Sequence, residues 1–123
     1  MSDTPLEPNS PMMLVLDRVA NKWAVLAVSA VCNQPKRFNQ LRREIGGISQ
    51  KMLSQTLKRL ERDGIVTRTV TATVPVTVEY AITDLGKTLA STVNHLRIWS
   101  ELNIDQILAA QTQYDRVAKM NVD

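Results

Sequence analysis

The feature that most constrains the fold is an amphipathic segment between glycines, GGISQKMLSQTLKRLERDG, which spans residues 46–64. Leucines recur in it at Leu53, Leu57 and Leu60, and intervals of four and three residues place them on one side of an α-helix. Ser49 suits the N-cap, because its hydroxyl can accept a hydrogen bond from a backbone N–H of the first turn. The segment therefore predicts a helix with a narrow buried stripe, which needs a helical core to pack against.

A shorter helix is expected directly before this segment. In RFNQLRREI, Phe38, Leu41 and Ile45 fall on one helical face. Gly46 and Gly47 end the pattern, since glycine adopts the left-handed conformation in which helices often finish. Two helices joined by a short turn that contains glycine form a helix-turn-helix arrangement.

Two further helices are predicted before this pair. The first begins near Pro11, because proline suits the first turn of a helix, and its apolar side comprises Met13, Leu14, Leu16, Val19 and Ala20. The second covers Trp23 to Cys32, a segment that is apolar almost all round and therefore fits a buried central helix. Residues 1–10 are polar and contain proline, without the basic start and apolar core of a signal peptide, and are expected to be a flexible tail.

The segments VTRTVTATV and VTVEYAIT alternate in polarity and are rich in β-branched residues, which predicts two strands of a hairpin with a loop around Ala72 to Thr77. A hairpin of two strands is marginal alone, so it must lie on the helices. Thr83 and Asp84 cap a long final helical region, and residues 103–120 either continue that helix or form another. The expected order is four helices, the hairpin and a final helical region, so the expected fold is a single domain that is mostly α with a small β-hairpin.

Positive charge is concentrated in one part of the chain. The segment from Lys36 to Arg68 holds nine lysines and arginines against three acids, a balance of +6, whereas the rest of the chain carries −3 within a net charge of +3. Such an asymmetry is typical of a surface that binds a polyanion. Ordinary solvated helix surfaces are the alternative interpretation.

The helix after Ser49 has the residue types that read DNA. With its leucines buried, an outer face free of acids until Glu61 holds Gln50, Lys51, Ser54, Gln55 and Lys58. Glutamine can pair with adenine, lysine with guanine and serine with either base, and a helix N-terminus suits a phosphate. In a helix-turn-helix the second helix enters the major groove. An ordinary solvent-exposed face is the alternative.

These segments together resemble the HxlR-type winged helix-turn-helix transcription regulators of bacteria. The resemblance runs from about Met13 to Trp99 and rests on NKW at residues 21–23, RFNQLRREIGGISQKMLSQTLKRLERDGIV at 37–66 and VPVTVEYAITDLGKTL at 74–89. It implies a winged helix-turn-helix domain over residues 11–123, in which one helix reads DNA and the hairpin serves as a wing. It also implies a homodimer whose terminal helices, about residues 84–118, form the dimer contact.

The resemblance implies DNA-reading roles for Gln50, Lys51, Ser54, Gln55 and Lys58, with Arg37 and Arg68 as contacts to the DNA backbone. Ser49 at the helix start and Arg42 on the preceding helix complete the candidate DNA-binding set. In many relatives a basic residue lies near the start of the second wing strand, where this chain has Thr77, and the wing loop here is apolar and uncharged. The electrostatic contribution of the wing is therefore expected to be small.

Cys32 is the single cysteine. Several members of the family sense oxidants or electrophiles through a cysteine near the chain start, a region that has none here. Packing is favoured for Cys32, because free cysteine is often buried. A redox-sensor role is the alternative and would require pairing between subunits or a small-molecule adduct.

Other classes of function are disfavoured by what the sequence lacks. With one His and one Cys there is no zinc cluster, and no nucleophile–base pair or Gly-rich phosphate loop indicates an enzyme, so no metal or cofactor is expected. No apolar run is long enough to span a membrane, and a cytoplasmic protein is expected. Two hypotheses remain. One is a homodimeric regulator that recognises a pseudo-palindromic operator, with no effector identified, and the other is a winged-helix module for protein contacts without sequence-specific DNA binding.

Overall fold

The computed structural model describes residues 7–13, 16 and 21–121. The chain divides into two units, residues 1–91 and 92–123, and helix α5 (Asp84–Met120) begins in the first and runs through the second. Pro11 to Met13 are helical, as predicted. Residues 1–6 of the predicted tail, and Leu14, Val19 and Ala20 of the predicted first helix, lie outside the described residues.

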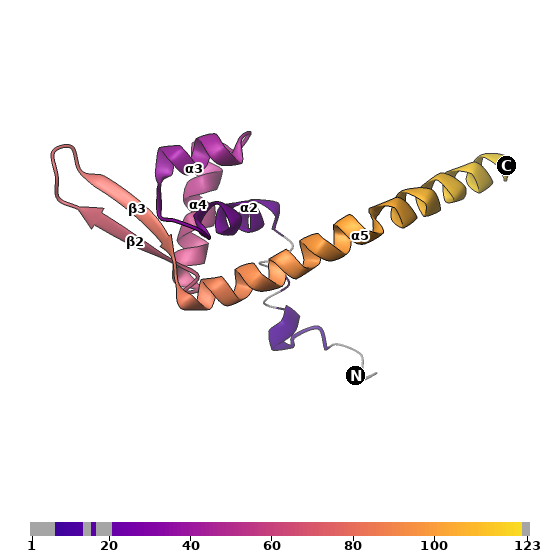
Figure 1. Ribbon diagram of the computed structural model, residues 1–123, viewed down its shortest axis with the longest axis horizontal. Helices are drawn as coiled ribbons and strands as arrows, with labels where there is room; N and C mark the ends of the chain where they lie inside the picture. The colour runs from indigo at the N-terminus through magenta and orange to yellow at the C-terminus, as the bar shows by residue number, and fades with distance from the viewer. Residues whose placement is uncertain (1–6, 14–15, 17–20, 122–123) are drawn as a thin grey trace. The chain divides into compact units, whose positions relative to one another are not determined.

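Three helices that lie wholly within the described residues pack together in the first unit, and Figure 1 shows their arrangement. They are α2 (Lys22–Val31), α3 (Phe38–Ile45) and α4 (Gln50–Arg62). Helix α2 starts at Asn21, whose Oδ1 accepts hydrogen bonds from the backbone N–H groups of Trp23 and Ala24 at 3.0 and 3.2 Å. The prediction that this helix is buried by its neighbours is confirmed, because four of its side chains are buried: Ala24, Ala27, Val28 and Val31.

The sheet has three antiparallel strands in the order β1-β3-β2. They are β1 (Lys36–Arg37), β2 (Val66–Thr71) and β3 (Thr77–Ile82). The predicted hairpin is β2 and β3, but the prediction of only two strands was wrong, because β1 pairs with the free edge of β3. A strand of two residues contains no repeat of polar and apolar positions, so its sequence gave no signal.

The register aligns one row of side chains across the sheet. Lys36 of β1 and Arg68 of β2 are both partners of Tyr80 in β3. Directly opposite residues in an antiparallel pair extend from the same face of a sheet. Tyr80 therefore lies between two basic residues, and it is also part of the buried core with an exposed fraction of 8%.

The core confirms the predicted leucine stripe. Leu53, Leu57 and Leu60 of α4 are each at most 1% exposed, and they pack with Leu41 of α3 and with the sheet. Burying a leucine side chain contributes about 1.5–3 kcal/mol, so this stripe fixes which face of α4 is left to solvent.

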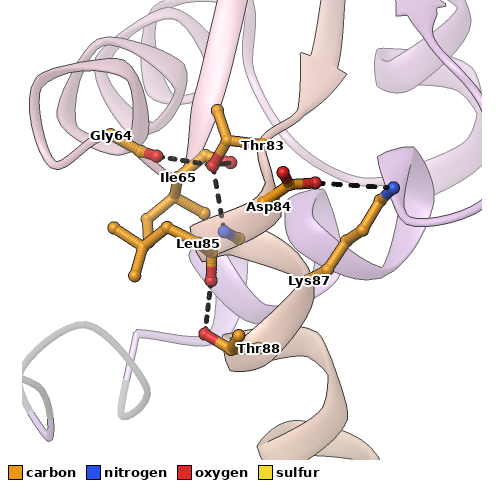
Figure 2. Close-up of polar contacts among 8 residues, drawn as sticks. Gly64, Ile65, Thr83, Asp84, Leu85, Lys87 and Thr88 are labelled. Carbon is orange, nitrogen blue, oxygen red and sulfur yellow. Dashed lines mark hydrogen bonds and ion pairs between the residues drawn. The ribbon is translucent and has the colours of Figure 1, made fainter.

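Thr83 links the sheet to α5, as Figure 2 shows. Its Oγ1 accepts a hydrogen bond from the backbone N–H of Gly86 at 2.9 Å, which makes Thr83 the predicted cap of the final helix. The region beyond it is one continuous helix to Met120, so residues 103–120 continue α5 and form no separate helix. Among the described residues, no helix combines the length and the apolar character needed to cross a bilayer.

Candidate nucleic-acid interface

The turn between α3 and α4 is held by local hydrogen bonds. Ser49 Oγ accepts a hydrogen bond from the backbone N–H of Met52 at 3.1 Å, which confirms the predicted N-cap. On the other side of the turn, Arg42 Nε donates to the carbonyl oxygen of Ile48 at 3.4 Å. Because Ile48 is buried, the start of α4 is fixed relative to α3.

The outer face of α4 has the composition that the sequence predicted. Gln50, Lys51, Gln55 and Lys58 are exposed, and Ser54 is half-buried. No hydrogen bond or ion pair joins the side chains of this set to any residue that the structure describes. In contrast, Thr56 on the buried side donates its hydroxyl hydrogen bond to the carbonyl oxygen of Met52 at 2.8 Å. Five polar side chains on one helical face are thus available to a ligand.

A surface cavity of about 460 Å³ lies between α4 and the sheet. Its helix side is lined by Gln50, Ser54 and Lys58, and its sheet side by Arg68 and Tyr80. The fold therefore brings three predicted residues of α4 together with Arg68, which follows Gln50 by eighteen positions in the sequence. Lys51 and Gln55 do not line this cavity, so they belong to the more outward part of the α4 face.

Arg37 lines a second surface cavity, of about 610 Å³, between the start of α3 and the wing. The wing side of this cavity includes Pro75, Val76 and Thr77. The tip of the wing is uncharged and its Val74 side chain is fully exposed. The basic side chains beside the wing thus come from α3 and its N-cap rather than from the wing loop.

Arg42 lines a third cavity, beside Gly47 and Ile48 in the turn before α4. Arg43 lines this cavity and the second one, although it was absent from the predicted site residues. Its only signal in the sequence was its place in the basic segment. Arg42 and Arg43 extend the row of basic residues from α4 to α3.

One basic residue of the segment has a structural use. Lys36 forms an ion pair with Glu44 of α3, and its side chain is only 13% exposed. This pair ties β1 to α3 and removes one positive and one negative charge from the surface together. The net charge of the segment is still +6 when this pair is left out, because eight basic residues and two acids remain.

Tyr80, Phe38 and Glu61 are residues of the α4 cavity that the sequence analysis did not identify. Phe38 and Tyr80 resembled ordinary core residues in the sequence, and Glu61 was noted only as the end of the acid-free face. Their common position depends on the pairing of β3 with β2 and on the packing of the sheet against α4. No periodicity within one segment reports such a contact.

Other kinds of site find little support. No group of three His, Cys, Asp or Glu residues within the described part of the chain could hold a metal ion. Cys32 is the C-cap residue of α2, is partly exposed and carries a free thiol. Neither packing nor a redox role is tested by this position, so both remain predictions.

The comparison with known proteins agrees with this geometry. The model of the HxlR-like helix-turn-helix family matches residues 18–108. This chain belongs to that family. Two predictions are therefore confirmed: the winged helix-turn-helix fold and the resemblance to the HxlR-type regulators.

Two solved structures and one sequence illustrate the relationship. The HTH-type transcriptional regulator YtfH of Escherichia coli strain K12 is 42% identical over 103 residues, which cover 84% of this chain and 82% of YtfH. A YtfH regulator from Salmonella typhimurium has a TM-score of 0.75 and 40% identity, covering 86% of this chain and 95% of its own. The redox regulator HypR in its reduced form has a TM-score of 0.76 and 39% identity, covering 81% and 99%. Since this HxlR-like family comprises transcriptional regulators, the prediction that the chain is not an enzyme is confirmed.

Proposed function

We propose that this HxlR-like protein is a sequence-specific DNA-binding transcriptional regulator that acts as a homodimer, with α4 in the major groove and the β2–β3 hairpin as a wing beside it. The observation that supports this function best is the outer face of α4. Its polar side chains have no partners within the described residues, and the buried leucines hold this face outward. The major groove is about 12 Å wide and admits one α-helix.

The two parts of the face have different proposed roles. Lys51 and Gln55 are exposed and do not line the cavity beside the sheet, and in this proposal they would contact base edges. Lys58 and Arg68 line that cavity from two elements and would neutralise phosphates. Arg37 and Arg42, which line the neighbouring cavities, would extend the contacts along the DNA backbone. The relatives are named as transcriptional regulators, and this supports the same function.

The homodimer is supported by the apolar residues of α5 within the second unit. Leu96, Trp99, Ile107 and Tyr114 are all substantially exposed there. An isolated helix buries too little apolar surface to offset the entropy of ordering it, so we expect a partner to cover these apolar side chains. Residues spaced alternately three and four positions apart lie on one side of this helix, which suits pairing with a second copy of itself. We call them the proposed dimer seam: Val93, Leu96, Ser100, Asn103, Ile107, Ala110, Tyr114 and Val117.

A protein-interaction module is the second candidate, because the same basic face could meet an acidic partner. The test is selection of bound fragments from genomic DNA, followed by affinity measurements with a selected and an unrelated duplex over a range of salt concentrations. A specific regulator should prefer the selected duplex by about 10³-fold or more, and a pseudo-palindrome should appear among the selected fragments. Equal affinity for both duplexes would contradict sequence-specific regulation and favour the interaction module.

A further inference from the structure

One residue that lines the cavity between α4 and the sheet is largely buried, yet its hydroxyl group has no partner among the described residues. Tyr80 is 8% exposed and lines this cavity, yet its hydroxyl forms no hydrogen bond with any residue that the structure describes. In the described part of the chain, Ser10 Oγ is the one side-chain oxygen or nitrogen that is both buried and without a partner. Because the Tyr80 oxygen also lacks a partner, it must be accessible to solvent. A buried tyrosine usually finds a partner for its O–H group. The open side of Tyr80 therefore indicates a ligand that enters from the cavity.

The charges around Tyr80 define the chemistry of that ligand. Arg68 is its direct neighbour across the sheet, and Lys58 faces both from α4. The opposite neighbour, Lys36, is neutralised by Glu44. Neither Lys58 nor Arg68 forms an ion pair with any described residue, including Glu61 in the same cavity. Two free positive charges and one free hydroxyl donor suit an anion with several acceptor oxygens.

We propose that this cavity is a seat for one phosphodiester of the DNA backbone, in which Tyr80 donates a hydrogen bond to a phosphate oxygen that Lys58 and Arg68 neutralise. The proposal rests on the proposed function, and it adds Tyr80 to the predicted DNA-binding residues as a direct contact to the backbone. The backbone is favoured over a free anion because the cavity is continuous with the α4 face: Gln50, Ser54 and Lys58 belong to both. Glu61 lines the same cavity, so its carboxylate would weaken the binding of the phosphate.

The experiment measures affinity for a selected operator in which each phosphodiester in turn is replaced by an uncharged methylphosphonate. The variant is Tyr80→Phe, which keeps the buried ring and removes only the hydroxyl, and the control is Ser91→Ala, which removes an exposed hydroxyl of α5 outside the proposed dimer seam. We expect Tyr80→Phe to lower the affinity about tenfold for every base sequence, since a hydrogen bond to a charged group is lost. The thermal unfolding midpoint of Tyr80→Phe should equal that of the wild type, and Ser91→Ala should change neither the affinity nor the midpoint.

The methylphosphonate series assigns the lost contact. In the wild type, one substituted position should weaken binding strongly, and the same position should matter much less in Tyr80→Phe and in Lys58→Ala, because the two changes remove one shared interaction. An identical position profile in the wild type and Tyr80→Phe would overturn the seat while leaving the proposed function intact. Absence of DNA binding by the wild type would overturn both.

Two further measurements test the charge argument. Glu61→Gln should raise the affinity about threefold for all sequences, because it removes a negative charge from the seat, and an unchanged or lower affinity would count against the proposal. Inorganic phosphate and chloride at matched ionic strength should weaken DNA binding alike. A loss of binding that is specific to inorganic phosphate and absent in Tyr80→Phe would overturn the assignment to DNA in favour of a free anion.

Discussion

Thr83 uses a single hydroxyl group for several contacts at the start of α5. Its Oγ1 lies 2.6 Å from the carbonyl oxygen of Gly64 and 3.0 Å from that of Ile65, to which it can donate, and it accepts from the backbone N–H of Gly86 (Figure 2). The same residue therefore satisfies carbonyls just after α4 and an N–H of α5. This makes Thr83 a link between the segment that follows α4 and the long final helix α5.

We expect Thr83→Ala to lower the free energy of unfolding by about 0.5–2 kcal/mol, the range measured for loss of a helix N-cap. Thr83→Ser is the matched control, because it keeps the hydroxyl and should retain most of the stability. Urea denaturation of the three proteins is the measurement. Equal stability of Thr83→Ala and the wild type would show that the hydroxyl has no stabilising role.

Gly86 allows the first turn of α5 to approach the backbone of Ile65, which lies between α4 and β2. A Cβ atom at this position would lie 2.3 Å from the carbonyl oxygen of Ile65 and 2.7 Å from Cγ1 of Ile82. Helix propensity alone would favour alanine over glycine by about 1 kcal/mol. The clash is with a backbone atom that cannot rotate away, so the steric term should dominate.

Gly86→Ala should therefore destabilise the protein by about 2 kcal/mol, within the usual cost of overpacking. Ser91→Ala is the control in the same helix at an exposed position and should stay within about 0.5 kcal/mol of the wild type. Both values come from urea denaturation monitored by circular dichroism. A stabilised Gly86→Ala protein would mean that α5 shifts away from Ile65 and Ile82 at little cost.

Helix α4 separates its functions by face. Its leucines anchor it to the core, its Gln50–Ser54–Lys58 side borders the cavity next to the sheet, and its outermost side carries Lys51 and Gln55. A contact to phosphate affects all sequences equally, whereas a contact to a base edge affects particular positions. The two kinds of residue are thus distinguishable by experiment.

Lys58→Ala should weaken binding to selected and unrelated DNA by a similar factor and lower the slope of log affinity against log salt concentration by about 0.9. Gln55→Ala should leave the salt slope unchanged and reduce discrimination at particular bases by about 1–3 kcal/mol. Lys119→Ala, an exposed charge near the end of α5, is the control for nonspecific electrostatics. If Lys119→Ala matched Lys58→Ala, the α4 face would have no special role in binding phosphate.

On the scale of the whole molecule, the proposed assembly rests on a second copy of the chain. Within the second unit, α5 exposes apolar side chains along most of its length. Pairing of two such helices would bury this seam and, through a two-fold axis, present two α4 helices to two half-sites of an operator. Oligomeric state and operator symmetry are therefore linked expectations.

Ile107→Asp should dissociate the dimer, because it places a charge in the middle of the proposed seam. Thr112→Asp introduces the same charge about 140° away around the helix and should leave the dimer intact. Sedimentation at several protein concentrations is the measurement, and loss of the dimer should also weaken operator binding. A monomeric wild type, or equal effects of the two changes, would contradict dimerisation through this seam.

The sequence alone determined the elements whose pattern repeats within one segment. The leucines of α4, the alternation of β2 and β3 and the caps at Ser49 and Thr83 were predictable, because each depends on residues a few positions apart. The basic surface was predictable as well, since its charges cluster in the sequence.

Only the tertiary structure decided which distant residues meet. Strand β1 exists because Lys36 and Arg37 pair with Tyr80 and Glu79 across more than forty residues, and a two-residue strand has no period to detect. The ion pair of Lys36 with Glu44 and the cavity that joins Lys58, Arg68 and Tyr80 depend on the same pairing and on the packing of α4. Periodicity reports the face of one element, whereas a site between elements is fixed by strand register and by the burial of the core.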